Sequence, residues 1–277
     1  MTEKNFRSNI QITIEKVRAE NPMAPSITNT VTQDFVANAQ LAVGGSAAMI
    51  YLPDEGESMA KIARAVYINL GTLMPFYAET IPRTLRALEK NKKPFVLDPV
   101  AIGIGNLRTE LLLQIKSFKP TIIRGNASEI ISLAKLWNLH EEEGGEVRGV
   151  DSTETVEKAA HSAVALAQYT NGTVAVSGEK DLITDGQVMI YSLGGSKLFS
   201  KITGSGCALG GVMAIYLTVA SPIIAAFTAT AMFNCAGHRA AEKASTPASF
   251  KVNFLDELYK ISAADVASSE FAVFNAE

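Results

Sequence analysis

Residues 202–210 read Ile-Thr-Gly-Ser-Gly-Cys-Ala-Leu-Gly, and they dominate the interpretation of the whole chain. The β-branched run Ser200–Thr203 predicts a strand, Gly204-Ser205-Gly206 a tight turn, and the uncharged residues from Cys207 onward a helix. The first turn of a helix has free N–H groups and the positive end of the helix dipole, so this order of elements predicts an anion site. Glycines let the backbone approach a ligand closely, and Cys207 adds one polar side chain beside the anion. A phosphate site next to a group that takes a proton is what phosphoryl transfer to an alcohol requires.

Two interpretations of Cys207 remain open at this point. At the start of a helix, the pKa of a thiol is expected to fall below its usual value of about 8.5, which favours a reactive group. A buried cysteine more commonly serves as a small apolar side chain, which is our interpretation of Cys235.

Composition restricts the class of protein. The chain has 277 residues, of which 47% are hydrophobic and 19% charged, so it can bury a large core, and we expect one domain over residues 1–277. A net charge of -3 without a basic block argues against nucleic acid or an anionic membrane as the partner. Two cysteines without a CxxC motif, and an N-terminus without an apolar segment, are typical of a cytoplasmic protein.

One long uncharged stretch, between Lys201 and Arg239, raises the question of a membrane span. Glycines and the pair Ser221-Pro222 interrupt it, so two buried helices over about 206–220 and 222–241 are the better interpretation.

Elsewhere, short apolar runs alternate with longer amphipathic ones. The apolar runs predict strands, at Ala47–Tyr51, Ala65–Leu70, Pro94–Asp98, Thr121–Arg124, Thr173–Ser177, Gln187–Tyr191 and Lys197–Thr203. The amphipathic runs predict helices, at Asp34–Val43, Glu55–Arg64, Phe76–Asn91, Leu107–Phe118, Ser128–Trp137, Thr153–Tyr169 (capped by Asp151 or Ser152) and Phe250–Ser262 (packing Phe254, Leu255, Leu258 and Tyr259). This alternation predicts an α/β fold with three layers, α-β-α, around a mostly parallel central sheet. Asp185-Gly186 predicts a hairpin turn at one sheet edge, and the charged, glycine-rich segment Glu141–Gly149 a surface excursion or lid.

Ligands of open α/β sheets bind beyond the carboxyl ends of the strands, so the residues at these ends are the first candidates for a site. Asp98 ends one run and is suited to Mg²⁺, although a turn or cap residue is an equally good interpretation. Arg124 could clamp phosphate oxygens with its planar guanidinium. Glu129 could be a second metal carboxylate, or could complete a capping box with Asn126, and the two roles are compatible.

Two further segments carry weaker signals. Ser177-Gly178 follows a strand and suits a nucleotide phosphate or ribose, although an ordinary turn is the commoner explanation. Thr28 or Asn29 is expected to cap the helix that follows it.

Taken in order, several of these stretches resemble one family. The stretches are Ile-Thr-Asn (27–29), Ala-Met-Ile-Tyr (48–51), Asn-Leu-Gly-Thr-Leu (69–73), Leu-Asp-Pro-Val (97–100), Ile-Arg-Gly-Asn-Ala-Ser-Glu (123–129), Ser-Gly-Glu (177–179) and Thr-Gly-Ser-Gly-Cys (203–207). Over about residues 21–258 the chain resembles hydroxyethylthiazole kinase of the ribokinase-like superfamily. The resemblance implies ATP-dependent phosphorylation of the hydroxyethyl group of 4-methyl-5-(2-hydroxyethyl)thiazole in thiamine salvage, with Mg²⁺, by a homotrimer whose active sites lie at subunit boundaries.

The resemblance also implies roles for individual residues. Cys207 would lie beside the attacking hydroxyl, and Gly204, Ser205 and Gly206 would form the anion hole. The remaining assignments are ATP contacts at Arg124, Ser177, Asn126 and Gly178, Mg²⁺ near Asp98 and Glu129, and a thiazole pocket at Met49, Asn29 and Gly204.

The chain departs from the family's pattern at Pro25-Ser26, at Ala101 where a glycine is usual, at Ser177 where threonine is usual, and at Ser205. Because Pro25-Ser26 falls near the expected acceptor pocket, two alternatives stay open. One is a related kinase acting on another small heteroaromatic or primary alcohol, and the other is a non-catalytic, ligand-binding relic of the fold.

Overall fold

A single sheet of eight strands organises the computed structural model, which describes residues 3–139 and 155–276. The strands lie side by side in chain order: β1 (Ser26–Ile27), β2 (Val66–Asn69), β3 (Phe95–Asp98), β4 (Ile122–Asn126), β5 (Thr173–Ser177), β6 (Asp181–Thr184), β7 (Val188–Ser192) and β8 (Phe271–Asn275). The first five are mutually parallel, and β5 to β8 pair antiparallel. All the carboxyl ends of β1 to β5 therefore meet at one edge of the sheet.

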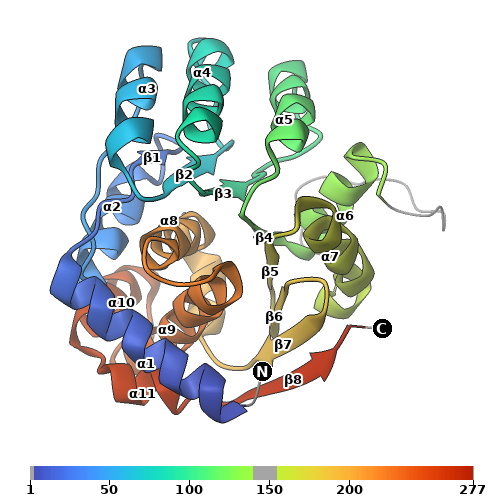
Figure 1. Cartoon of the computed structure of the whole chain (residues 1–277). Helices are drawn as coiled ribbons and strands as arrows, with labels where there is room; N and C mark the ends of the chain where they lie inside the picture. Colours follow the sequence, from blue (N-terminus) through green and yellow to red (C-terminus); the bar gives the residue numbers. More distant parts are fainter. Residues whose placement is uncertain (1–2, 140–154, 277) are drawn as a thin grey trace.

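Helices cover both faces of this sheet, and Figure 1 shows the sheet curving around α8 and α9. The crossover helices are α2 (Gln33–Ala42), α3 (Pro53–Ile62), α4 (Tyr77–Lys90), α5 (Asn106–Phe118), α6 (Ala127–Leu136) and α7 (Val156–Thr170). The remaining helices are α1 (Glu3–Glu20), the 3-10 helix η1 (Lys197–Lys201), α8 (Ser205–Leu217), α9 (Pro222–Lys243), α10 (Pro247–Lys260) and α11 (Ala263–Ala267).

Each face of the sheet has its own hydrophobic core. One core lies between the sheet and helices α1, α2, α8, α9 and α10, and the other between the sheet and α3 to α7. This is the predicted three-layer α-β-α arrangement with a mostly parallel sheet. Within residues 3–139 and 155–276, no helix is long and apolar enough to cross a membrane. The uncharged stretch forms α8 and α9, as expected from its interruptions.

Two of the predicted strands are wrong. Residues 46–50 run beside β1 but form only isolated bridges, and the neighbouring Ala24 carbonyl accepts a side-chain hydrogen bond from Gln40 Nε2 (3.0 Å). Lys197–Thr203 begins as the 3-10 helix η1, whose first turn is capped by Ser196 Oγ accepting from Leu198 N (3.1 Å). Its Phe199 ring packs on those of Phe250 and Phe254, with centroids 5.2 and 5.0 Å away.

Smaller corrections concern helix ends and single residues. The cap of α2 is Thr32 rather than Thr28 or Asn29. Tyr259 does not pack in the core, since it is 74% exposed. Helix α1 and strand β8 were not predicted, and β8 rather than the β6–β7 hairpin forms the sheet edge. The segment Glu141–Gly149 and the expected caps Asp151 and Ser152 lie outside the described residues.

Candidate active site

Three neighbouring strands deliver polar side chains to the same point of the sheet edge. Asp98 is the last residue of β3, Arg124 lies in β4, and Ser177 ends β5. Arg124 joins the other two: Nη1 lies 3.3 Å from Asp98 Oδ2, and Nη2 donates to Ser177 Oγ at 2.9 Å. Asp98 is fully buried and Arg124 is 8% exposed, so this ion pair is largely shielded from water.

The start of α8 faces this ion pair. Gly204 caps the helix with φ +88°, a left-handed conformation, and a Cβ there would lie 2.6 Å from Thr32 Cγ2. The first intrahelical bond runs from Ala208 N to Gly204 O (2.8 Å), so the amides of residues 205–207 precede the helical ladder. A Cβ on Gly206 would lie 2.3 Å from Arg124 Nη1. The predicted helix start therefore exists, with a 3-10 helix rather than a strand before it.

A cleft of about 860 Å³ opens in front of the helix start. Of the predicted site residues, Arg124, Ser177, Gly178, Ser205 and Gly206 line it. Sequence reasoning missed most of the other lining residues, which are Glu179, Asp181, Gly194, Gly195, Ser196, Lys197, Phe199, Ser200, Lys201, Leu209, Thr230, Phe233 and Asn234. The pair Gly194-Gly195 is a turn signal in the sequence that points to this wall of the cleft. Both residues adopt left-handed φ values, of +126° and +80°.

The floor of the cleft is tied together by Asn234 of α9. Its side-chain Nδ2 donates to Asp181 Oδ2 (2.9 Å) and Ser192 Oγ (3.2 Å), and its backbone carbonyl accepts from Gly195 N (3.2 Å). Burial raises the pKa of Asp181, while the bonds from Asn234 and from Gly178 N oppose that shift. Asn234 thus connects α9 to the sheet through its side chain and to the glycine turn through its backbone carbonyl.

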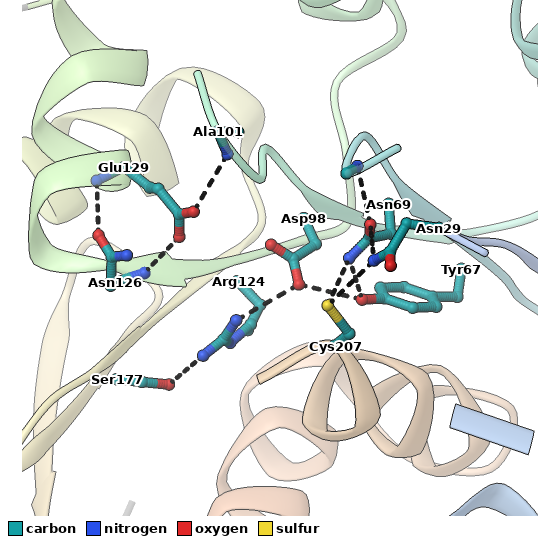
Figure 2. A network of polar contacts seen from close by, with 11 residues as sticks. Asn29, Tyr67, Asn69, Asp98, Ala101, Arg124, Asn126, Glu129, Ser177 and Cys207 are labelled. Atoms are coloured by element: carbon teal, nitrogen blue, oxygen red, sulfur yellow. Dashed lines mark hydrogen bonds and ion pairs between the residues drawn. The ribbon is translucent and has the colours of Figure 1, made fainter. Parts of the chain in front are cut away.

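A second network, shown in Figure 2, lies behind Arg124 and reaches Cys207. Asn69 Nδ2 donates to Cys207 Sγ (3.2 Å) and to Tyr67 Oη (2.8 Å), and Asn29 Nδ2 lies 3.4 Å from the same sulfur. Tyr67 Oη donates to Asp98 Oδ2 at 3.0 Å. The network connects the thiol to the carboxylate through buried side chains only.

The expected fall in the pKa of Cys207 is wrong. Burial is the largest effect and raises the pKa of this thiol, and the neighbouring Asp98 adds to the increase. Arg124 and the hydrogen bonds from Thr32 and Asn69 act in the other direction but do not outweigh burial. At neutral pH the group is therefore a thiol.

Asp98 has the character of a cation ligand. Burial raises its pKa to about 6; Arg124 opposes this shift, and the negative charge of Glu129 adds to it. Its Oδ1 is buried and has no hydrogen-bond partner among the described residues. A hard cation would satisfy that oxygen and relieve the repulsion between the two carboxylates. No group of three or more His, Cys, Asp or Glu is assembled in the described chain, so the cation would also need phosphate oxygens or water. With that supplement, the residues fit Mg²⁺.

The capping interpretation of residues 126–129 is confirmed. Asn126 Oδ1 accepts from Glu129 N (2.9 Å), and Glu129 Oε2 accepts from Asn126 N (2.8 Å). Glu129 Oε1 also accepts from Ala101 N (3.4 Å), which places its carboxylate beside the segment that follows β3. Asn126 does not line the cleft. Met49 is half-buried beside β1, outside the cleft and on the side of Asn29.

Comparison with known proteins adds an independent line of argument. A sequence model of the hydroxyethylthiazole kinase family matches residues 14–264. A hydroxyethylthiazole kinase of Bifidobacterium longum subsp. infantis is 47% identical, over 97% of this chain and 91% of its own. The hydroxyethylthiazole kinase structure from Pyrococcus horikoshii OT3 superposes with a TM-score of 0.85 at 30% identity, covering 97% of this chain and 99% of that one. A ribokinase-like superfamily protein from Enterococcus faecalis shares the fold alone (13% identity, TM-score 0.58, 93% and 89% covered).

Proposed function

The chain belongs to the hydroxyethylthiazole kinase family, and from this premise we propose that it transfers the γ-phosphoryl group of ATP to the hydroxyethyl group of 4-methyl-5-(2-hydroxyethyl)thiazole. It is a kinase that phosphorylates an alcohol. Neither another acceptor alcohol nor a non-catalytic role is favoured. A role in thiamine salvage follows from this acceptor, and the cytoplasmic location stays a prediction from composition.

The observation that supports this function best is the meeting of Arg124, Asp98 and the start of α8 at one end of the cleft. ATP would lie in the cleft with its phosphates toward that end, where the amides of residues 205–207 and the Arg124 guanidinium supply positive charge. Ser177 and Gly178 would contact the nucleotide beside Arg124. Lys197 and Lys201 add cationic side chains to the same cleft.

Mg²⁺ would be held by Asp98, through its unpartnered Oδ1, and by Glu129 beside the segment that follows β3. When bound, the ion neutralises charge on the transferred phosphoryl group. The protein's own share is to keep both carboxylates in place, through Arg124 and Tyr67 on Asp98 and through the capping box on Glu129.

The acceptor would bind on the opposite side of Arg124 from the cleft, against Asn29, Met49 and Gly204, with its hydroxyl beside Cys207. Because the pKa of Cys207 is raised, this residue orients the hydroxyl rather than acting as a thiolate base. Phosphoryl transfer has a loose transition state, so the alcohol loses its proton late and positioning supplies most of the rate.

A homotrimer with active sites at subunit boundaries is part of the proposal. Four exposed apolar side chains lie in the segments that follow β1, residues 46–50, β2 and β3, and would be covered by a neighbouring subunit: Val31 (66% exposed), Leu52 (51%), Phe76 (39%) and Ile104 (51%). A monomeric mass by light scattering at micromolar concentration would contradict this assembly.

The test of function is a coupled ADP-release assay with Mg²⁺-ATP and a panel of small alcohols. We expect turnover with the thiazole alcohol above all others. Asp98→Ala should abolish most activity, whereas Cys207→Ala should lower kcat and leave the KM for ATP nearly unchanged. Turnover with other alcohols alone would exclude the thiazole as acceptor, and nucleotide binding without any turnover would exclude catalysis.

A further inference from the structure

A buried tyrosine connects the two halves of the site. Tyr67 lies in β2, next to β3, and is fully buried. Side chains two residues apart in a strand share a face, so Tyr67 and Asn69 point to the same side of the sheet, toward α8. Figure 2 shows the Tyr67 hydroxyl at the junction between Asn69, Asp98 and Cys207.

The hydroxyl has a defined task at Asp98. Oδ2 of that carboxylate accepts hydrogen bonds from both Tyr67 Oη (3.0 Å) and Arg124 Nη1 (3.3 Å), while Oδ1 has no partner in the described chain. Two donors on one oxygen fix the rotation of the carboxylate and leave the other oxygen available. Arg124 alone would leave this rotation less restrained, because it supplies a single, longer contact.

The same hydroxyl accepts a hydrogen bond from Asn69 Nδ2 at 2.8 Å. That Nδ2 also donates to Cys207 Sγ, at 3.2 Å, and the Asn69 Oδ1 is held by Gly71 N (2.9 Å) and Asn29 Nδ2 (3.1 Å). Because both ends of the amide are occupied, the orientation of Asn69 is fixed. The phenol is the link between this fixed amide, which contacts the thiol, and the Asp98 carboxylate.

Helix α8 is shaped to admit this phenol. A Cβ on Gly210 would lie 2.6 Å from Tyr67 Cε2 and 2.8 Å from both Cζ and Oη. Gly210 follows Cys207 by one turn of α8, so the helix that carries the thiol rests directly on the tyrosine ring. Any larger residue at position 210 would push the ring, the helix, or both.

We propose that Tyr67 is a positioning residue for phosphoryl transfer, and that Gly210 provides the space that lets its hydroxyl hold the Asp98 carboxylate and the Asn69–Cys207 pair in one arrangement. The proposal deepens the proposed function and depends on it for the identity of the reaction. Tyr67 does not line the cleft and acts through Asp98 and Asn69, so losing its hydroxyl is expected to slow the chemical step and weaken the metal held at Asp98 without removing a direct contact to either substrate.

Tyr67→Phe tests the hydroxyl and keeps the ring. The matched control is Tyr216→Phe in α8, because Tyr216 is equally buried and its Oη has no partner among the described residues. We expect kcat of Tyr67→Phe to fall by about tenfold or more, as for loss of a hydrogen bond to a charged group. The KM for the acceptor should stay within about twofold of the wild type, and Tyr216→Phe should match the wild type in both parameters.

A second measurement does not depend on turnover. Binding of Mn²⁺ in the presence of ADP, followed by the EPR signal of free Mn²⁺, should be several-fold weaker in Tyr67→Phe and unchanged in Tyr216→Phe. Wild-type behaviour of Tyr67→Phe in either measurement overturns the proposal. An equal loss of kcat and melting temperature in both variants assigns Tyr67 to packing and also overturns it. A wild-type enzyme inert toward every alcohol refutes the proposed function, and the Mn²⁺ measurement still decides the role of Tyr67.

Gly210→Ala tests the space for the ring. It should lower kcat in the wild-type background but add nothing in a Tyr67→Leu background, where the ring atoms that the new methyl meets are absent. Equal losses in the two backgrounds overturn the pairing of Gly210 with Tyr67.

Discussion

Gly206→Ala is the most informative single substitution at the helix start. The added Cβ would lie 2.3 Å from Arg124 Nη1 and 2.5 Å from Nη2, about 1 Å inside the optimal contact distance of roughly 3.5 Å. The guanidinium is the end of a flexible side chain, so it will move before the helix does. Moving it breaks the contacts to Asp98 (3.3 Å) and to Ser177 (2.9 Å).

Two magnitudes follow from that displacement. Loss of hydrogen bonds between charged groups should lower the free energy of unfolding by about 1–3 kcal/mol, which leaves the protein folded. A shift of about 1 Å in a group that positions the transferred phosphoryl should lower kcat/KM on the order of 100-fold. Activity should thus be lost far beyond what the loss of stability explains.

The assay combines steady-state ADP release with urea unfolding across a double-mutant cycle. In an Arg124→Ala background the clash is absent, so Gly206→Ala should leave stability unchanged, or raise it by about 0.5–1 kcal/mol through helix propensity. The residual activity of the Arg124→Ala variant should likewise not fall further when Gly206→Ala is added. If Gly206→Ala alone keeps kcat/KM within about threefold of the wild type, or if the two effects on stability are additive, the contact between Gly206 and Arg124 does not control the site.

Three further changes test other parts of the structure. In metal-free buffer, Asp98 has a folded pKa of about 6, against an ordinary value of 3.8, so it keeps a proton that the unfolded chain has lost. The free energy of unfolding should therefore fall by on the order of 3 kcal/mol as pH rises from about 4 to 6. Urea titrations of Asp98→Asn should lack this slope, and an identical slope in both proteins would refute the assignment. Ala101→Gly should stabilise the protein by up to about 1 kcal/mol. Alanine in the left-handed conformation at φ +59° costs roughly 1–2 kcal/mol of strain in the folded state, which exceeds the roughly 0.4–1 kcal/mol by which glycine increases the entropy of the unfolded chain. A lower melting temperature would contradict this. Asn234→Ala should raise the KM for ATP several-fold with kcat nearly kept. It should also lower the free energy of unfolding by about 1–3 kcal/mol, since Asp181 Oδ2 loses its partner, whereas Asn253→Ala on the surface of α10 should change neither.

The residues at strand ends could be predicted because parallel strands deliver their carboxyl ends to one edge. The runs that end at Asp98, Arg124 and Ser177 predict three side chains at one place on the sheet edge, and these three are in contact in the structure. The capping box of Asn126 and Glu129 was equally predictable, since it depends only on residues three apart.

What escaped prediction depends on contacts between distant segments. The strand expected over residues 197–203 is a 3-10 helix because Phe199 joins an aromatic cluster with α10, some fifty residues later in the chain. Tyr67 read as one more apolar strand residue, and only the proximity of β2, β3 and α8 gives its hydroxyl partners. The pKa of Cys207 could not be inferred from its helix position, because burial and the charge of Asp98 raise it and both depend on segments distant in the sequence.

The departure at Pro25-Ser26 illustrates how a difference in sequence can lie near a site without facing its ligand. Ser26 is fully buried, and its Oγ lies 3.3 Å from Gln40 Nε2. The same Nε2 donates to the carbonyl of Gly211 in α8 at 3.1 Å, so position 26 is connected to the helix that carries Cys207. A change at Ser26 would therefore affect the proposed acceptor site through the position of α8. Discrimination between acceptor alcohols has to come from side chains nearer the Cys207 sulfur, such as Asn29, whose Nδ2 contacts that sulfur.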